Sequence, residues 1–220
     1  MPARQADAII LRTYPLREID RLVTFFSRQF GKCRGVGHGA ARSQRRFGAA
    51  LQPLTQVRVS FFERPNQELV SLERCEVVAT MWPGSTEYAA PDYARSVALG
   101  YIAEIADKLL PDREVNDAAY RLLAAVLAAL REGGPPWLPL LYDLYWMVRL
   151  GGFLPDLESA PLSEDNRYWG RMLAKTSLAA IPAAGWESSA QAAGLRSFLH
   201  AQLEQHLEQR VRSWNLLNEL

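Results

Sequence analysis

Apolar and polar residues alternate along the first 80 residues with a period of two, which is typical of half-buried β-strands. The alternation is clearest in residues 56–61, where Val57, Val59 and Phe61 are separated by polar side chains. Four further runs have the same character, and they span residues 9–14, 22–26, 32–40 and 69–78, with a turn at 64–66 before the last. Five short strands in about 75 residues predict a small closed barrel, because closure removes exposed strand edges, and the five-stranded OB-fold is the expected form.

From Pro91 onward the apolar residues recur with the period of an α-helix. Pro91-Asp92 resembles a helix start, and Gly and Pro pairs mark later boundaries. The pattern predicts four helices, at about 91–109, 115–132, 137–150 and 195–217. Residues 153–190 are rich in Pro, Ala and Ser and weakly periodic, which predicts a loop with one or two short helices.

The change of period divides the chain into two expected domains. Residues 81–91, MWPGSTEYAAP, cluster Pro and Gly as linkers do. The sequence therefore predicts an α+β protein of two domains, with an N-terminal OB-fold β-barrel at residues 1–80 followed by an all-α helical domain at residues 81–220.

The net charge of +1 hides a strong asymmetry between these two parts. Residues 1–80 hold 13 Lys and Arg against 7 Asp and Glu, a net charge of +6. Residues 81–220 hold 12 against 17, a net charge of −5. Such an asymmetry suggests that an anion-binding part is joined to a part with other duties.

Metal and cofactor sites are not expected, because the two cysteines and three histidines are not spaced along the chain as metal ligands usually are. Cys33 and Cys75 are predicted to be buried, reduced thiols. His200 and His206 are six residues apart, outside the i, i+4 spacing of a shared site, and are predicted to be ordinary surface residues.

Catalytic and membrane motifs are also missing from the sequence. There is no phosphate-binding glycine loop, no GxSxG and no HExxH, so we do not expect an enzyme. The longest uncharged apolar run, Leu122–Leu130, is far too short to span a bilayer, and the N-terminus lacks the layout of a signal peptide. A cytoplasmic protein is expected.

Residues 31–47, GKCRGVGHGAARSQRRF, contain a dense group of basic residues and no acid. The basic residues are Lys32, Arg34, His38, Arg42, Arg45 and Arg46. In a strand, Lys32, Arg34 and His38 share one face, and the small residues between them lie on the inner face of the barrel. We therefore expect the cations to point outward together and to bind nucleic-acid phosphates. The alternative interpretation is a solvated basic face that protects a sheet edge.

Aromatic side chains that stack on bases are the usual second ingredient of single-strand binding. Near the basic segment the sequence offers Tyr14, Phe47 and Phe62, and Phe47 either stacks on a base or fills the barrel. This thin supply favours binding dominated by the phosphate backbone and tolerant of sequence.

Several short motifs, in order along the chain, resemble the bacterial RecO family. They are Asp20-Arg21-Leu22-Val23-Thr24, Gly31-Lys32 with Arg34-Gly35-Val36, Gly39-Ala40 with Arg42, Arg46-Phe47-Gly48, Leu51-Gln52-Pro53-Leu54, Gly151-Gly152-Phe153-Leu154-Pro155-Asp156-Leu157 and Arg212-Ser213-Trp214-Asn215-Leu216-Leu217. The resemblance implies an OB-fold followed by a helical domain and a recombination mediator in DNA repair. Such a protein binds single-stranded and double-stranded DNA, anneals complementary strands and, with RecR, helps load RecA onto DNA coated by single-stranded-DNA-binding protein.

The resemblance also implies contact with the C-terminal tail of single-stranded-DNA-binding protein. That tail is acidic and ends in a hydrophobic residue and a carboxylate, so its receptor should combine an apolar pocket with a cation. The helical domain offers candidates of both kinds, namely Arg121, Trp137, Tyr142, Trp146 and Arg149.

The chain departs from the family pattern at residues 153–190. Many members carry a four-cysteine zinc-binding insertion there, whereas this segment contains no cysteine. It is therefore expected to be a zinc-free counterpart, either rebuilt or held by packing of Tyr168, Trp169, Met172, Leu173 and Trp186. Two other functional classes stay open, an OB module that binds RNA or protein without annealing activity, and a nuclease or other enzyme.

Overall fold

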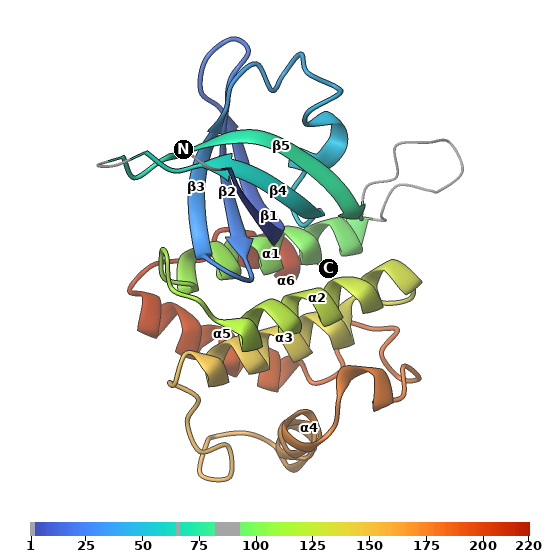
Figure 1. The fold of residues 1–220 in the computed structure, drawn as a ribbon. Helices are drawn as coiled ribbons and strands as arrows, with labels where there is room; N and C mark the ends of the chain where they lie inside the picture. The colour runs from blue at the N-terminus through green and yellow to red at the C-terminus, as the bar shows by residue number, and fades with distance from the viewer. Residues whose placement is uncertain (1–2, 65–66, 82–92) are drawn as a thin grey trace. The chain divides into compact units, whose positions relative to one another are not determined.

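The computed structural model describes residues 3–64, 67–81 and 93–220 (Figure 1). Three predicted features lie mostly or entirely outside these ranges. They are the turn at 64–66, the linker at 81–91 and the helix start at Pro91-Asp92. The chain forms two compact units, one made of residues 1–91 with Ala106–Tyr120 and the other of Asp92–Ile105 with Arg121–Leu220.

The first unit contains a closed barrel of five strands (Figure 1). The strands are β1 (Arg4–Pro15), β2 (Arg21–Ser27), β3 (Gly31–Gly37), β4 (Gln56–Phe62) and β5 (Val70–Ala79), with a short 3-10 helix, η1 (Gly48–Leu51), before β4. Their order is β1-β2-β3-β5-β4, closed by antiparallel pairing of β1 with β4, and only β3 and β5 run parallel. The predicted five-stranded OB-fold is confirmed, although β3 ends at Gly37 instead of continuing to residue 40.

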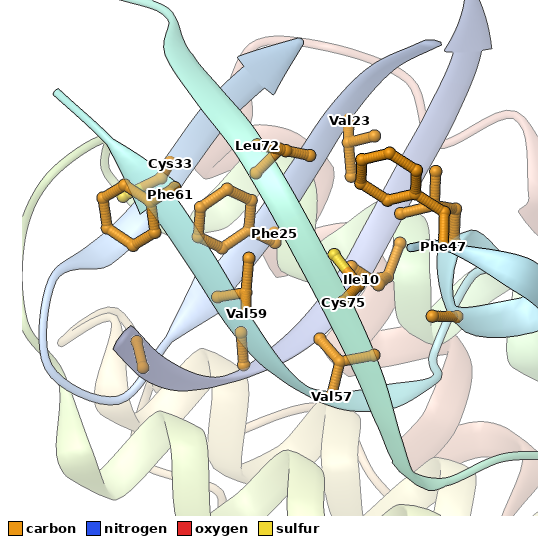
Figure 2. Close-up of a cluster of buried hydrophobic side chains, with 14 of the residues drawn as sticks. Ile10, Val23, Phe25, Cys33, Phe47, Val57, Val59, Phe61, Leu72 and Cys75 are labelled. Atoms are coloured by element: carbon orange, nitrogen blue, oxygen red, sulfur yellow. The ribbon is translucent and has the colours of Figure 1, made fainter. Parts of the chain in front are cut away.

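Side chains from all five strands fill the barrel interior, and those of β1, β2 and β4 come from alternate positions (Figure 2). Val57, Val59 and Phe61 of β4 are buried as their spacing predicted, and both cysteines are buried and free. Phe47, from the loop after β3, is also buried in this cluster, so it fills the barrel and is not available to stack on a base. Gly35 leaves space for β5, because a Cβ atom there would lie 2.7 Å from a methyl group of Val70.

Residues 106–120 pack against the barrel, although the change of period at residue 91 had predicted that they belong to the helical domain. They comprise the end of helix α1 (Tyr93–Leu109), a connecting loop and the first turn of helix α2 (Asp117–Glu132). Asp112 forms a parallel bridge with Lys32 of β3, and the Arg113 N–H donates to the Lys32 carbonyl oxygen at 2.8 Å. This segment therefore continues the hydrogen bonding of the barrel.

The second unit is helical, as predicted. Besides most of α1 and α2 it contains α3 (Trp137–Leu150), α4 (Glu164–Lys175), the short η2 (Leu178–Ala180), α5 (Ala193–Leu207) and α6 (Ser213–Asn218). Among the described residues no helix is long and apolar enough to cross a membrane.

The single helix predicted over 195–217 is wrong, because α5 and α6 are separate. The chain leaves the helical conformation at Glu208, which has a φ of +52°. The buried Glu104 carboxylate then accepts the N–H groups of Arg212 and Ser213 at 3.0 and 2.9 Å and the Ser213 hydroxyl at 2.7 Å. These hydrogen bonds provide acceptors for backbone N–H groups at the start of a second helix, which have no partner within that helix. The break between the two helices is therefore stable, although the apolar spacing continues across it.

His200 is buried, which contradicts the prediction of a surface histidine. Its Nδ1 atom lies 3.0 Å from the Tyr101 hydroxyl, and its ring stacks on Trp214 at a centroid distance of 3.7 Å. Burial lowers the pKa of His200, so the neutral ring is favoured inside the unit. His206 is exposed, as predicted, and stacks on Phe153.

The segment 153–190 contains α4 and η2, in agreement with the prediction of one or two short helices. Leu173 and Trp186 are buried, and the Trp186 ring packs edge-on against Trp169 at 4.8 Å. In the described ranges no three His, Cys, Asp or Glu side chains gather in a way that would hold a metal ion. Aromatic and aliphatic packing therefore supports this segment.

Candidate nucleic-acid interface

Two loops are tied together at one end of the barrel, the β1–β2 turn and the loop after β3. The Asp20 carboxylate accepts the Gly39 N–H at 2.9 Å and contacts His38 Nδ1 at 3.3 Å. The Ala41 N–H donates to the Ile19 carbonyl oxygen at 3.0 Å. The hydrogen bond from Gly39 lowers the pKa of Asp20, which keeps the carboxylate ionised and able to accept both contacts.

Six basic residues belong to these two loops or adjoin them in the sequence, and we call them the loop-end cluster. They are Arg17, Arg21, His38, Arg42, Arg45 and Arg46. The last four were predicted from the sequence, and Arg42, Arg45 and Arg46 are exposed as expected. Arg17 and Arg21 were missed because they lie about 20 residues upstream, although the antiparallel pairing of Arg21 with Gly37 brings that strand alongside.

Arg46 is fixed in place by its neighbours. Its guanidinium donates to the His38 carbonyl oxygen at 2.7 Å and to the Ser43 hydroxyl at 3.1 Å, and it lies 5.2 Å from the centre of the Phe47 ring. Its own carbonyl oxygen accepts the Cys75 N–H of β5 at 2.9 Å. Arg46 therefore anchors the loop to the barrel, whereas Arg42 and Arg45 are exposed side chains of the same loop.

Two hollows flank the loop-end cluster. One, of about 260 Å³, is lined by Thr13, Arg21, Ser43 and neighbouring loop residues. The other, of about 420 Å³, is lined by apolar residues that include Val36 and Val70 and by the charged or polar side chains of His38, Arg64 and Glu68. Of the three aromatic candidates, Tyr14 is exposed and Phe62 is half-buried. Among these three candidates Tyr14 is thus the most exposed to solvent.

Lys32 does not point into solvent, and this part of the prediction is wrong. The side chain is buried, and its ammonium group donates to the Asp107 carbonyl oxygen at 2.6 Å and contacts the Asp112 carboxylate at 3.2 Å. Arg34 is exposed and lies 3.4 Å from the same carboxylate. The alternation placed both residues outside the barrel correctly, but the acidic segment 106–120 covers that side.

The same segment neutralises further barrel cations. Asp107 pairs with Arg12 at 2.7 Å, and Asp117 pairs with Arg28 at 2.6 Å. The Phe26 ring of β2 lies against Tyr120 at 6.1 Å. Arg4, Arg58 and Arg74 elsewhere on the barrel pair with Glu63, Asp7 and Glu76. Most barrel arginines away from the loop end therefore lie beside a carboxylate.

We expect Lys32→Met to lower the stability of the protein and to leave DNA affinity within about twofold of the parent. Loss of the buried ammonium group removes its hydrogen bond and leaves the half-exposed Asp112 to solvent, so the free energy of unfolding should fall by about 1–2 kcal/mol. Arg34→Met, which removes an exposed partner of the same carboxylate, should cost under about 1 kcal/mol. Urea unfolding and DNA titration of both variants check this, and a large loss of affinity in folded Lys32→Met would contradict it.

The five partner-binding candidates of the helical unit are not all brought together. Tyr142, Trp146 and Arg149 lie along α3, with the Arg149 guanidinium 5.0 Å from the Trp146 ring centre and 3.2 Å from the Tyr145 hydroxyl. Trp137 is buried beneath the Arg196 guanidinium, so it is part of the core. Arg121 is exposed on α2.

Comparison with known proteins agrees with this fold and its order. Residues 1–81 match the family model described as Recombination protein O N terminal, and residues 90–166 match the one described as Recombination protein O C terminal. The DNA repair protein RecO of Koribacter versatilis is 42% identical over 99% of each chain. The protein of the same name from Anaeromyxobacter dehalogenans is 30% identical over 100% of this chain and 98% of its own length. Together these matches extend over both units, and they establish that the chain belongs to the RecO family.

Proposed function

We propose that this protein is a recombination mediator in bacterial DNA repair that binds the phosphate backbone of DNA through the loop-end cluster. The observation that carries the proposal is the junction at Asp20, which joins basic residues from two separate segments at one end of an OB-fold barrel. Membership of the RecO family and the name DNA repair protein of its relatives support the same role.

The chemistry is electrostatic and not catalytic. Arginine side chains pair with phosphates, and release of condensed counterions drives binding with little regard to base sequence. A surface that neutralises two complementary strands reduces their mutual repulsion, so strand annealing follows from the same cluster. Both single-stranded and double-stranded DNA are suitable ligands, since each offers the same phosphates. The site of action is the nucleoid in the cytoplasm.

The helical unit is proposed to receive the acidic tail of single-stranded-DNA-binding protein. Tyr142, Trp146 and Arg149 on α3 combine aromatic surface with a cation, which suits a peptide that ends in a hydrophobic residue and a carboxylate. Together with RecR, such contact would help RecA to load onto DNA coated by that protein.

The test of the DNA site is the variant Arg42→Gln/Arg45→Gln/Arg46→Gln. Its affinity for a mixed-sequence single-stranded DNA should fall at least about tenfold at low salt. The slope of log affinity against log salt should become shallower by about 2, because each lost phosphate contact contributes about 0.7. Fluorescence anisotropy across a salt series measures both quantities, and circular dichroism checks the fold.

A matched control removes three positive charges elsewhere on the barrel, through Arg4→Gln/Arg58→Gln/Arg74→Gln. These arginines are exposed and already paired with Glu63, Asp7 and Glu76. If this control loses as much affinity as the loop-end variant, total charge and not the cluster governs binding. If the parent itself prefers RNA or fails to bind DNA at low salt, the protein is an RNA-binding or protein-interaction module instead.

A further inference from the structure

We infer that Asp20, an acidic residue inside the loop-end cluster, is a positioning residue for DNA binding, and that removing its negative charge weakens binding instead of strengthening it. This inference rests on the proposed function of the cluster. Asp20 lies beside Arg21 and three residues from Arg17, and its side chain is only 10% exposed.

Both oxygens of the Asp20 carboxylate are engaged with the residues that open the basic loop. One accepts the Gly39 N–H at 2.9 Å and the other lies 3.3 Å from His38 Nδ1. The backbone carbonyl oxygen of Asp20 also accepts the backbone N–H of Leu16 at 3.2 Å and an N–H of the Arg21 guanidinium at 3.1 Å. Asp20 thus fixes the β1–β2 turn and the loop after β3 in one arrangement.

The anchored turn then carries the arginines. Gly39 has a φ of +65°, and its carbonyl oxygen accepts the N–H groups of Arg42 and Ser43, each at 3.1 Å. The His38 carbonyl oxygen accepts the Arg46 guanidinium at 2.7 Å. Two of the phosphate-binding arginines are therefore placed by backbone groups that Asp20 holds, and an unanchored loop would have to be ordered again by each DNA molecule that binds.

Electrostatics and geometry predict opposite results for this residue. A carboxylate near bound phosphates is repulsive, so its removal alone should strengthen binding. The carboxylate also holds the loop, so its removal should release Arg42 and Arg46 from their preorganised positions. Glu18 provides the comparison, because it lies two residues away in the same turn and is exposed.

The experiment compares Asp20→Ala with Glu18→Ala, two variants with the same change in charge. Glu18→Ala should bind single-stranded DNA as tightly as the parent or up to about threefold more tightly. Asp20→Ala should bind at least about fivefold more weakly, with a shallower salt slope, since fewer phosphates are engaged at once. Asp20→Asn should recover part of the loss, because the amide oxygen still accepts the Gly39 N–H.

Hydrogen exchange gives a measurement independent of DNA and guards against general unfolding. In Asp20→Ala the amides of Gly39, Arg42 and Ser43 should exchange faster, while those of β1, β2 and β4 remain protected. If Asp20→Ala unfolds the barrel, the DNA affinities of Asp20→Asn and Glu18→Gln are compared instead.

The outcomes separate this inference from the proposed function. Loss of binding in the loop-end arginine variant together with tighter binding in folded Asp20→Ala overturns only the inference. A parent that does not bind DNA, or an arginine variant that binds as well as the parent, overturns the proposed function. In that case unchanged exchange at Gly39 in Asp20→Ala would still refute the positioning role.

Discussion

Gly31→Ala is expected to lower the free energy of unfolding by at least about 3 kcal/mol, through strain in the backbone and a clash with the segment 106–120. Gly31 has a φ of +67°, a conformation that residues with a Cβ atom rarely adopt. A Cβ atom there would also lie 2.2 Å from the carbonyl oxygen of Glu114. This neighbour is backbone, so relief requires the segment to move away from β3 and weakens the pairing of Lys32 with Asp112.

Gly48→Ala is the matched control in the same unit. Gly48 also has a positive φ, of +46°, but the atom nearest to its added Cβ would be the Gln44 side-chain oxygen at 3.8 Å, an ordinary contact. Its substitution should therefore cost only about 1 kcal/mol. Urea unfolding of the two variants gives the comparison, and equal losses would mean that the close packing of Glu114 on β3 does not contribute to stability.

Asp143→Asn is expected to make the protein more stable than the parent at pH 8, by about 5 kcal/mol, and to match it near pH 4. Asp143 is fully buried in α3, and within the described chain neither of its carboxylate oxygens has a hydrogen-bond partner. Burial raises the pKa of Asp143 to about 8. Between pH 4 and 8 the unfolded chain loses this proton while the folded chain keeps it, so the parent loses stability as the pH rises.

The difference in free energy of unfolding between the parent and Asp143→Asn reports on the Asp143 carboxyl group alone. His200 acts in the opposite direction, because its pKa is lowered by burial and its contribution to stability is lost as the pH falls. That effect is common to the parent and to Asp143→Asn and cancels in the difference. Glu73→Gln, which removes an exposed carboxylate on β5, is the matched control for the loss of one acidic group. A constant difference between Asp143→Asn and the parent from pH 4 to 8 would show that Asp143 is ionised in the folded state.

The fold was largely predictable because the signals that specify it are local. The period of two in residues 56–61 placed Val57, Val59 and Phe61 inside the barrel, and the burial of all three follows. The Gly pair at 133–134 marked the end of α2. Where one helical spacing continued across a break, at Glu208, the pattern failed, since the cap comes from Glu104 about 100 residues earlier.

The candidate site was only partly predictable for a related reason. The sequence identified the basic segment and four members of the loop-end cluster, and alternation correctly directed Lys32 away from the barrel interior. It did not reveal that an acidic segment some 75 residues later would cover Lys32, or that Asp20 would join Arg17 and Arg21 to the loop after β3.

The sequence by itself therefore determined the barrel, the helical unit, the buried core and the existence of a basic segment, because periodicity and local charge are properties of neighbouring residues. The tertiary structure alone decided which cations are paired, which are exposed, and that Phe47 is core and His200 is buried. Those outcomes depend on what a side chain meets after it leaves its own strand or helix. That partner comes from a distant part of the chain, which no local pattern specifies.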